Sequence, residues 1–372
     1  MQKLLLKITI SFLAVLILQS CKTYQKIDKE STKAAMLKAL QWQEANPIQS
    51  QSPTDWTNAA YYTGIVKAHE ATADKTYLDA LGKMAKRNNW QVSERFYHAD
   101  DLAMCYSYIY LKSLGQDANL QPTDQIIKDH LYKDYPWKSG MATDEKKILW
   151  WWCDALFMAP PVLTSYAKLK NDDAYLKEMD KYYKQTYNLL YDKKEHLFAR
   201  DTRYLLTGKD SDLKEKNGKK IFWSRGNGWV IAGLALVLTD LPKDYPTRPF
   251  YENLFKEMAG KLKGLQPNDG LWRTSLLSPE SFNHGEVSGS GFFTYALAWG
   301  INNGLLNKAT YRPSVTKAWN SLLKCQKVSG KVGWVQNIGS DPKPADADSW
   351  QNFGTGAFLM AGSEILKLKK NQ

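Results

Sequence analysis

The sequence predicts an all-α protein, an (α/α)6 barrel of six helical hairpins with short β-hairpins at its rim. Strand-like alternation of apolar and polar residues is scarce, whereas apolar residues recur at helical spacing from about Ser31 onward. Charged amphipathic segments and segments that are apolar nearly all round alternate along the chain, six times over. Amphipathic helices cover a surface and all-round apolar helices are buried, so the six pairs predict six outer helices around six inner ones.

The amphipathic segments are the expected outer helices, and they cover residues 32–45, 76–89, 124–135, 174–192, 249–265 and 313–327. The apolar segments, rich in Gly and Ala, are the expected inner helices, and they cover residues 56–72, 98–115, 151–169, 225–241, 287–306 and 352–368. Pro160 and Pro161 predict a break in the third inner helix, because proline disrupts the helix interior. Turn-rich segments at 196–208, 270–279 and 330–340 are expected to form the rim. The irregular spacing of the pairs excludes a solenoid with a fixed period.

The N-terminus is typical of an exported lipoprotein. Residues 1–7 are short and basic, and residues 8–18 form an apolar run too short to span a membrane. The run ends in Leu-Gln-Ser-Cys, which resembles a bacterial lipobox with Cys21 as the lipidated residue. We therefore expect a signal peptide at 1–20, a tether at 21–32 and one barrel domain at 33–372. The expected location is the periplasm or outer membrane of a Gram-negative bacterium, with membrane contact only through the lipid.

Composition favours an anionic carbohydrate as the partner. Aromatic residues make up 13% of the chain and the net charge is +12. Stacking of sugar rings on aromatic faces fits the first observation, and attraction of anions fits the second. No basic tract interleaved with aromatics and no nucleic-acid motif is present, so a nucleic acid is not expected. The four cysteines and five histidines show no metal-binding spacing, so no metal or other cofactor is expected.

Each expected inner helix begins with a cluster of polar or aromatic residues. In a barrel of parallel inner helices, six helix N-termini open at one end, and their unpaired N–H groups favour an anionic ligand. We therefore place the site at this end. The candidate substrate-binding residues are Trp56, Tyr61, His98, Trp152, Arg200, Arg225, Trp229, Ser288, Ser290 and Trp350. Among them, Arg225 is suited to bidentate pairing with a carboxylate, and the two serines either cap their helix or bind a sugar hydroxyl.

Asp154 is the candidate catalytic acid. It follows three tryptophans and a cysteine, and such apolar surroundings raise the pKa of a carboxyl group. A raised pKa suits an acid that gives a proton and later takes one back. The alternative is that Asp154 caps a helix. Asp100 and Asp101 provide a second carboxylate, and spacing alone does not distinguish them. Two facing carboxylates also suit a conventional glycoside hydrolase.

Four motifs carry a resemblance to a known family: "YHADDLAM", "WWCDALFMAPP", "FWSRGNGW" and "EVSGSGFFTYALAWGI". In this order they are similar to those of the unsaturated uronyl hydrolases, the unsaturated rhamnogalacturonyl and glucuronyl hydrolases of glycoside hydrolase family 105, related to family 88. The resemblance spans about residues 33–368 and implies an (α/α)6 barrel. It implies that Asp154 is the acid/base and that Asp100 assists it. It also implies that Arg225 and Trp229 contact sugar. Arg200 stands where the family has a histidine.

The resemblance implies removal of a terminal 4,5-unsaturated uronic acid, glucuronic or galacturonic, from oligosaccharides made by lyases. The expected reaction is hydration of the C4=C5 double bond, and the expected neighbouring sugar is rhamnose or sulfated rhamnose, as in rhamnogalacturonan or ulvan. One alternative is a conventional inverting glycoside hydrolase or a polysaccharide lyase on the same barrel. Another is a glycan-binding lipoprotein without catalysis.

Overall fold

The structure is a computed structural model, and it describes residues 27–48, 52–133 and 148–369. The predicted signal peptide and Cys21 lie outside the described residues. The sequence predicts that the barrel begins at residue 33, but helix α1 begins at Lys29. Its early start has a local cause: the Asp28 side chain accepts a hydrogen bond from Ser31 N at 2.9 Å and so caps the helix.

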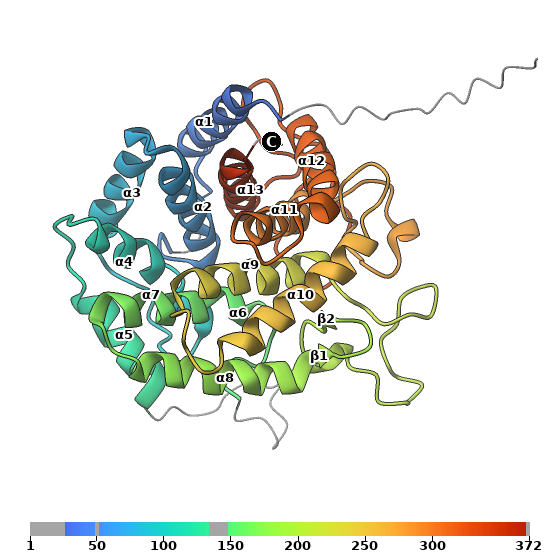
Figure 1. The fold of residues 1–372 in the computed structure, drawn as a ribbon, viewed down its shortest axis with the longest axis horizontal. Helices are drawn as coiled ribbons and strands as arrows, with labels where there is room; N and C mark the ends of the chain where they lie inside the picture. The colour runs from blue at the N-terminus through green and yellow to red at the C-terminus, as the bar shows by residue number, and fades with distance from the viewer. Residues whose placement is uncertain (1–26, 49–51, 134–147, 370–372) are drawn as a thin grey trace, which may run out of the picture.

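Two rings of helices alternate along the described chain (Figure 1). The outer ring consists of α1 (Lys29–Ala45), α3 (Lys75–Arg87), α5 (Gln121–Tyr132), α8 (Ala174–Leu190), α10 (Arg248–Gly264) and α12 (Lys308–Lys324). The inner ring consists of α2 (Trp56–Thr72), α4 (Cys105–Ser113), α6 (Ala155–Met158) with α7 (Pro160–Lys170), α9 (Ser224–Asp240), α11 (Val287–Asn302) and α13 (Asn352–Lys367). This arrangement confirms the predicted barrel and the predicted order of its hairpins.

Burial follows the two kinds of sequence pattern. In α9 and α11 nearly every residue is buried, whereas α3 and α8 bury one face and expose the other. The barrel closes where the last inner helix, α13, packs on the first, α2 (Figure 1). A Cβ atom at Gly64 would lie 2.5 Å from the Gly356 carbonyl oxygen, so this closure depends on glycine at the point of contact.

The third inner helix is broken at the predicted position. Helix α6 ends at Met158, and α7 begins at Pro160, where the missing N–H of proline is tolerated in a first helical turn. The second inner helix is also divided, because a short 3₁₀ helix, η1 (Ala99–Leu102), precedes α4. Two further 3₁₀ turns, η2 (Thr202–Tyr204) and η3 (Pro279–Ser281), lie in rim segments.

The rim contains less strand than the sequence predicts. In the described part of the chain the one sheet pairs β1 (Tyr191–Asp192) with β2 (Leu197–Phe198), antiparallel. The segments at 270–279 and 330–340 contribute isolated bridges, Trp223 with Ser275 and Gln326 with Val332. Their backbone groups bond in part to inner-helix starts: the Thr274 carbonyl accepts from Ser224 N, and Gln336 N donates to Glu286 Oε1.

The starts of the inner helices meet at one end of the barrel. Contacts between them join α13 to α2 (Asn352 to Asn58), α2 to α9 (Trp56 to Trp229), α9 to α11 (Ser224 to Gly289), α9 to α6 (Gly226 to Asp154) and η1 to α6 (His98 to Trp152). None of the helices in the described residues is long and apolar enough to cross a membrane.

Candidate active site

A cavity of about 850 Å³ opens at this end of the barrel. It lies between the start of α2, the loop that leads into η1, the start of α6 and the loop after β2. Five of the predicted site residues line it: Trp56, His98, Asp100, Trp152 and Arg200. Asp154 is not part of the lining, but it is joined to the lining by Arg200, and its side chain retains 10% of its exposure.

Asp154 occupies the N-cap position of α6 without capping it. Its Oδ2 accepts a hydrogen bond from Arg200 Nε at 3.0 Å, and its Oδ1 accepts a weak one from Cys153 Sγ at 3.8 Å. The alternative that Asp154 is a helix cap is therefore wrong. Burial raises the pKa of this carboxyl, and the charge and hydrogen bond of Arg200 oppose that rise.

Local backbone contacts hold Asp154 in place. The Cys153 N–H donates to the Arg200 carbonyl at 2.8 Å, which fixes the start of α6 against the loop after β2. A Cβ at Gly226 would lie 3.2 Å from Cys153 Sγ and 3.6 Å from Asp154 Oδ1. Gly226 therefore leaves room for Cys153 Sγ and the Trp223 ring, whereas the distance to Asp154 is that of an ordinary contact.

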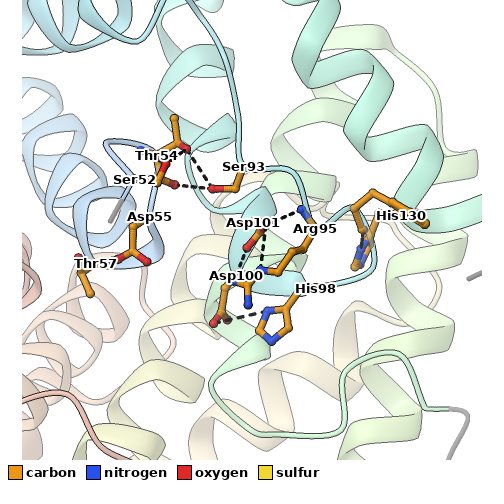
Figure 2. Close-up of polar contacts among 11 residues, drawn as sticks. Ser52, Thr54, Asp55, Thr57, Ser93, Arg95, His98, Asp100, Asp101 and His130 are labelled. Carbon is orange, nitrogen blue, oxygen red and sulfur yellow. Dashed lines mark hydrogen bonds and ion pairs between the residues drawn. The ribbon is translucent and has the colours of Figure 1, made fainter. Parts of the chain in front are cut away.

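The structure distinguishes Asp100 from Asp101. Asp101 is 3% exposed, and it accepts hydrogen bonds from Arg95 Nη2 at 2.6 Å and from the Arg95 backbone N–H at 2.8 Å. Both aspartates line the cavity, but Asp100 lies next to His98 and away from Arg95's hydrogen bonds (Figure 2). Its Oδ1 is buried and has no hydrogen-bond partner among the described residues. Asp100 is therefore the second carboxylate of the site.

The surroundings of Asp100 favour its protonated form. Burial raises its pKa to about 8, and the nearby charges of Asp154 and Asp101 add to the effect. His98 Nδ1 lies 3.6 Å from Asp100 Oδ2, too far for a hydrogen bond. Burial, with the charge of Arg95, lowers the pKa of His98 to about 3, so this imidazole is neutral. It packs against Trp152 with ring centroids 4.5 Å apart and the ring planes tilted by 40°. At neutral pH Asp100 holds a proton.

Arg200 has two carboxylate partners. Besides its bond to Asp154, its Nη1 donates to Asp201 Oδ2 at 2.8 Å. Asp201 is 1% exposed and also accepts hydrogen bonds from Arg203. The Arg200 side chain is 17% exposed where it lines the cavity, and its guanidinium carbon lies 5.9 Å from the ring centre of Trp151.

The chain is similar to known enzymes. The family model described as Glycosyl Hydrolase Family 88 matches residues 22–369. The chain belongs to this family. It is similar to an unsaturated 3S-rhamnoglycuronyl hydrolase of Formosa agariphila, with 59% identity over 94% of this chain and 95% of that protein. A protein of the same name from an Alteromonas species is 34% identical over 87% of this chain and 80% of its own.

A solved structure, described as a glycosyl hydrolase family 88 protein from Bacteroides vulgatus, is also similar. It aligns with a TM-score of 0.80 and 32% identity and covers 91% of this chain and 99% of its own. These likenesses confirm the resemblance drawn from the motifs, and they identify the chain as a glycoside hydrolase. Within the described part of this family 88 enzyme, no group of three or more His, Cys, Asp or Glu side chains could hold a metal ion.

Arg225 does not lie where a substrate clamp would. It is fully buried, and its Nη1 and Nη2 donate to the carbonyl oxygens of Gln336 and Asn337 at 2.7 and 2.8 Å. Its guanidinium packs against the rings of Trp223 and Phe353, at 4.4 and 4.7 Å from their centres. The prediction that it binds the acidic group of the substrate is corrected: Arg225 ties a rim segment to α9.

Ser288 and Ser290 also have partners within the protein. The Ser288 hydroxyl donates to Glu286 Oε1 at 2.6 Å, and Glu286 caps α11 by accepting from the N–H groups of Ser288 and Gly289. The Ser290 hydroxyl accepts from Trp272 N at 2.9 Å. Both serines are fully buried. Of the two alternatives, a role within the protein is supported, and neither hydroxyl faces the cavity.

Three predicted aromatic contacts lie away from the cavity. Trp229 is 1% exposed and packs between Phe157 and Phe292 in the barrel core. Tyr61 donates its hydroxyl to a Glu44 oxygen at 3.0 Å and lines a separate, smaller pocket. Trp350 packs edge-on against Trp42. These placements correct the predicted sugar contacts, because each of the three side chains already packs against or hydrogen-bonds to another part of the protein.

The sequence interpretation missed other residues that line the cavity. They are chiefly Trp151, Arg95 and a group of three hydroxyl-bearing residues, Ser52, Thr54 and Ser93. In that group Thr54 Oγ1 lies 2.9 Å from Ser52 Oγ and 3.0 Å from Ser93 Oγ (Figure 2). Trp151 stands in the tryptophan run before Asp154, and that position was a usable signal. Arg95 and the hydroxyl residues lie in irregular loops, where no periodic pattern singles them out.

Proposed function

We propose that this family 88 enzyme removes a terminal 4,5-unsaturated uronic acid from lyase-made oligosaccharides by hydrating the C4=C5 double bond. The single observation that carries the proposal is the pair of carboxyl groups beside the cavity: Asp100 Oδ1 is buried without a hydrogen-bond partner among the described residues, and Asp154 is bound to Arg200. The names of the two curated relatives, both unsaturated 3S-rhamnoglycuronyl hydrolases, support the substrate class.

The proposed reaction needs one proton given and one proton taken. The double bond forms a vinyl ether with the ring oxygen, so a proton added at C4 leaves a cation at C5 that this oxygen stabilises. Water then attacks C5 and loses a proton, which gives a hemiketal. The hemiketal opens and the neighbouring sugar leaves. The anomeric carbon is never attacked, so the carboxylate spacing of ordinary glycosidases does not apply. Asp100 and Asp154 together supply both proton transfers.

We propose that the neighbouring sugar is a sulfated rhamnose, as in ulvan. Arg95 and Arg200 are the two arginines among the lining residues, and Trp56, Trp151 and Trp152 provide ring faces for sugars. Arg95 is half exposed while it holds Asp101. The cavity of about 850 Å³ has room for more than one sugar ring. The names of the two relatives support rhamnose in particular.

The test follows the ultraviolet absorbance of unsaturated oligosaccharides when the enzyme is added. Hydration abolishes this absorbance, and we expect the loss to be fastest when the neighbouring rhamnose carries sulfate. A lyase would instead raise the absorbance of saturated polymers, and a conventional hydrolase would release saturated sugars. A glycan-binding protein would bind the oligosaccharide and leave the absorbance unchanged. Persistent absorbance with every unsaturated substrate would refute the proposal.

We also propose that the protein is an exported lipoprotein anchored through Cys21. The basic start, the short apolar run and the Leu-Gln-Ser-Cys sequence support this. The test compares the full-length protein with Cys21→Ser after expression in a Gram-negative host. We expect the former to be labelled by palmitate and to sediment with membranes, and the variant to do neither. Equal labelling of both forms would refute the anchor.

A further inference from the structure

A second cavity lies at the end of the barrel opposite the active site, and we call it the far-end cavity. Its volume is about 490 Å³, and it is formed by the C-terminal turns of α2, α9, α11 and α13 together with the start of α12. The active-site cavity lies where inner helices begin, so the length of the barrel separates the two cavities. The proposed reaction does not use the far-end cavity.

The lining of the far-end cavity carries an excess of positive charge. Its charged residues are four lysines and two glutamates: Lys67, Lys308, Lys367, Lys369, Glu70 and Glu364. Each glutamate has a lysine as an ion-pair partner, Lys67 for Glu70 and Lys367 for Glu364. The other two lysines leave the lining net positive, which favours an anionic ligand.

One of these lysines is deeply buried. The Lys67 side chain is 2% exposed, and Glu70 is its one ion-pair partner among the described residues. An ammonium group has three N–H donors, and a buried charge is costly unless it is paired and hydrogen-bonded. Lys67 therefore has donors left for oxygen atoms of a ligand. Entry is open, because the side chains of Glu70 and Lys367 are 29% and 35% exposed.

A buried tyrosine next to these charges has no hydrogen-bond partner. Tyr295 is fully buried, and its hydroxyl is unpaired among the described residues. Burial raises the pKa of this hydroxyl, the charge of Lys67 opposes the rise and the charge of Glu364 adds to it, so the hydroxyl lies close to both residues. An unpaired buried hydroxyl costs free energy, and a polar ligand in the cavity offers it a partner.

The ends of the helices do not by themselves explain the lysines. Helix C-termini attract cations, because their last carbonyl groups carry partial negative charge. Two of these carbonyls are already bound by asparagine side chains: Asn303 Nδ2 donates to the Trp299 carbonyl and Asn302 Nδ2 donates to the Glu364 carbonyl, both at 2.9 Å. The excess positive charge is therefore available to an anion.

We propose that the far-end cavity binds a single sugar acid, a carboxylate that carries several hydroxyl groups. The carboxylate pairs with the excess lysine charge, and the hydroxyls donate to Glu70 and Glu364 and accept from Lys67 and Tyr295. Sulfate has no hydroxyl for the two glutamates, and a neutral sugar has no charge for the lysines. The cavity volume suits a ligand of one sugar unit. This site does not depend on the proposed function of the active site.

The first experiment measures the Kd of D-glucuronate by calorimetric titration of the enzyme. D-Glucose lacks the carboxylate and inorganic sulfate lacks the hydroxyls, so we expect both to bind at least about tenfold more weakly. Equal binding of sulfate would indicate an adventitious ion only, and equal binding of glucose would show that the lysines are not used. Either result, or no binding of glucuronate, would overturn the proposal.

The second experiment locates the bound glucuronate with charge-removing variants. Lys308→Gln combined with Lys369→Gln should raise the Kd by about tenfold or more, because charged partners are lost. Arg95→Gln removes a charge from the active-site cavity instead, and the Kd should stay as in wild type. Binding that Arg95→Gln abolishes and the lysine variant retains belongs to the active site and would overturn the proposal. The lysine variant should keep the kcat/KM of wild type, which shows that its fold is intact.

Tyr295→Phe tests the buried hydroxyl. This variant removes an unpaired polar atom and keeps the ring, so its melting temperature should not fall. We expect the Kd of glucuronate to rise about two- to tenfold, since one hydrogen bond to the ligand is lost. A hydroxyl without a ligand would leave the Kd unchanged, and that result would overturn the proposed site. If the enzyme leaves unsaturated oligosaccharides intact, the proposed function fails, while the glucuronate titrations still test this proposal.

Discussion

The open end of the barrel has two halves that use carboxylates in opposite ways. In one half, at the starts of α2, η1 and α6, Asp100 faces the cavity with an oxygen that has no partner among the described residues. In the other half, at the starts of α9, α11 and α13, Glu286 accepts four hydrogen bonds. They come from the backbone N–H and hydroxyl of Ser288 and from the backbone N–H groups of Gly289 and Gln336.

The arginines of the two halves differ in the same way. Arg200 is partly exposed and lies between two carboxylates, whereas Arg225 is fully buried and binds two backbone carbonyls. The segment around Gln336 covers the second half and binds Arg225 through two carbonyl oxygens, whereas Ser224 Oγ and Arg225 Nε have no hydrogen-bond partner among the described residues. An unpaired buried group therefore does not by itself mark the active site, and Asp100 differs from these two atoms because it lines the cavity.

The largest expected effect is that of Asp154→Asn in the open half. The amide has nearly the same shape but takes up no proton from water, so kcat should fall by about 10²- to 10⁴-fold. Substrate binding should persist, because the cavity lining is unchanged. Absorbance loss under saturating substrate measures kcat, and calorimetric titration measures binding. Near-normal kcat in this variant would remove Asp154 from the reaction.

In the covered half we expect a loss of stability instead of activity. Glu286→Ala removes the cap of α11 and leaves buried N–H groups of Ser288, Gly289 and Gln336 without an acceptor. The free energy of unfolding should fall by about 2–4 kcal/mol. Denaturant unfolding measures this change, and kcat well below the melting temperature should stay within a few-fold of wild type. A fall in kcat as large as that of Asp154→Asn would erase the distinction between the halves.

How far the sequence predicts this division depends on the kind of interaction involved. The hairpin order follows from local periodicity, because every helix must bury its own apolar face whatever its neighbours are. The placement of Asp100 and Asp154 at one end follows from the same pattern. The distinction between Asp100 and Asp101 does not, because it depends on where the Arg95 side chain turns in an irregular loop.

The role of Arg225 could not be predicted from the sequence for a similar reason. Its partners are carbonyl groups of Gln336 and Asn337, which lie 111 and 112 residues further along the chain in a segment without regular structure. A motif shows that an arginine stands at a helix start, but not whether a distant loop covers it. Trp229 was placed wrongly for the same reason, and the choice between the two alternatives for Ser288 and Ser290 stayed open, since packing partners from other helices and loops decide their exposure.

A smaller effect is expected on stability when the open carboxyl is removed by Asp100→Asn. In the folded enzyme the pKa of Asp100 is raised to about 8 from its ordinary value of 3.8. Its stabilising contribution is therefore complete below the ordinary pKa and is lost as pH rises through about 8, because the unfolded chain ionises first. The neutral amide has no such loss. The variant should melt at a higher temperature than wild type by a few degrees at pH 8, with the difference vanishing near pH 4. Thermal melts across this range provide the measurement, and a difference independent of pH would contradict the assigned pKa.

The smallest effect compares one tryptophan from each half. Trp151 lines the cavity beside Arg200, whereas Trp350 packs on Trp42 outside it. Loss of an aromatic face that stacks on a sugar costs about 0.5–1.5 kcal/mol, so Trp151→Ala should raise KM about two- to tenfold. Trp350→Ala should leave KM unchanged, since its ring has a protein partner instead of a substrate. Initial rates over a range of oligosaccharide concentrations separate KM from kcat for both variants. Because both substitutions remove the same side chain, a rise in KM confined to Trp350→Ala would mean that substrate enters through the half that the Gln336 segment covers.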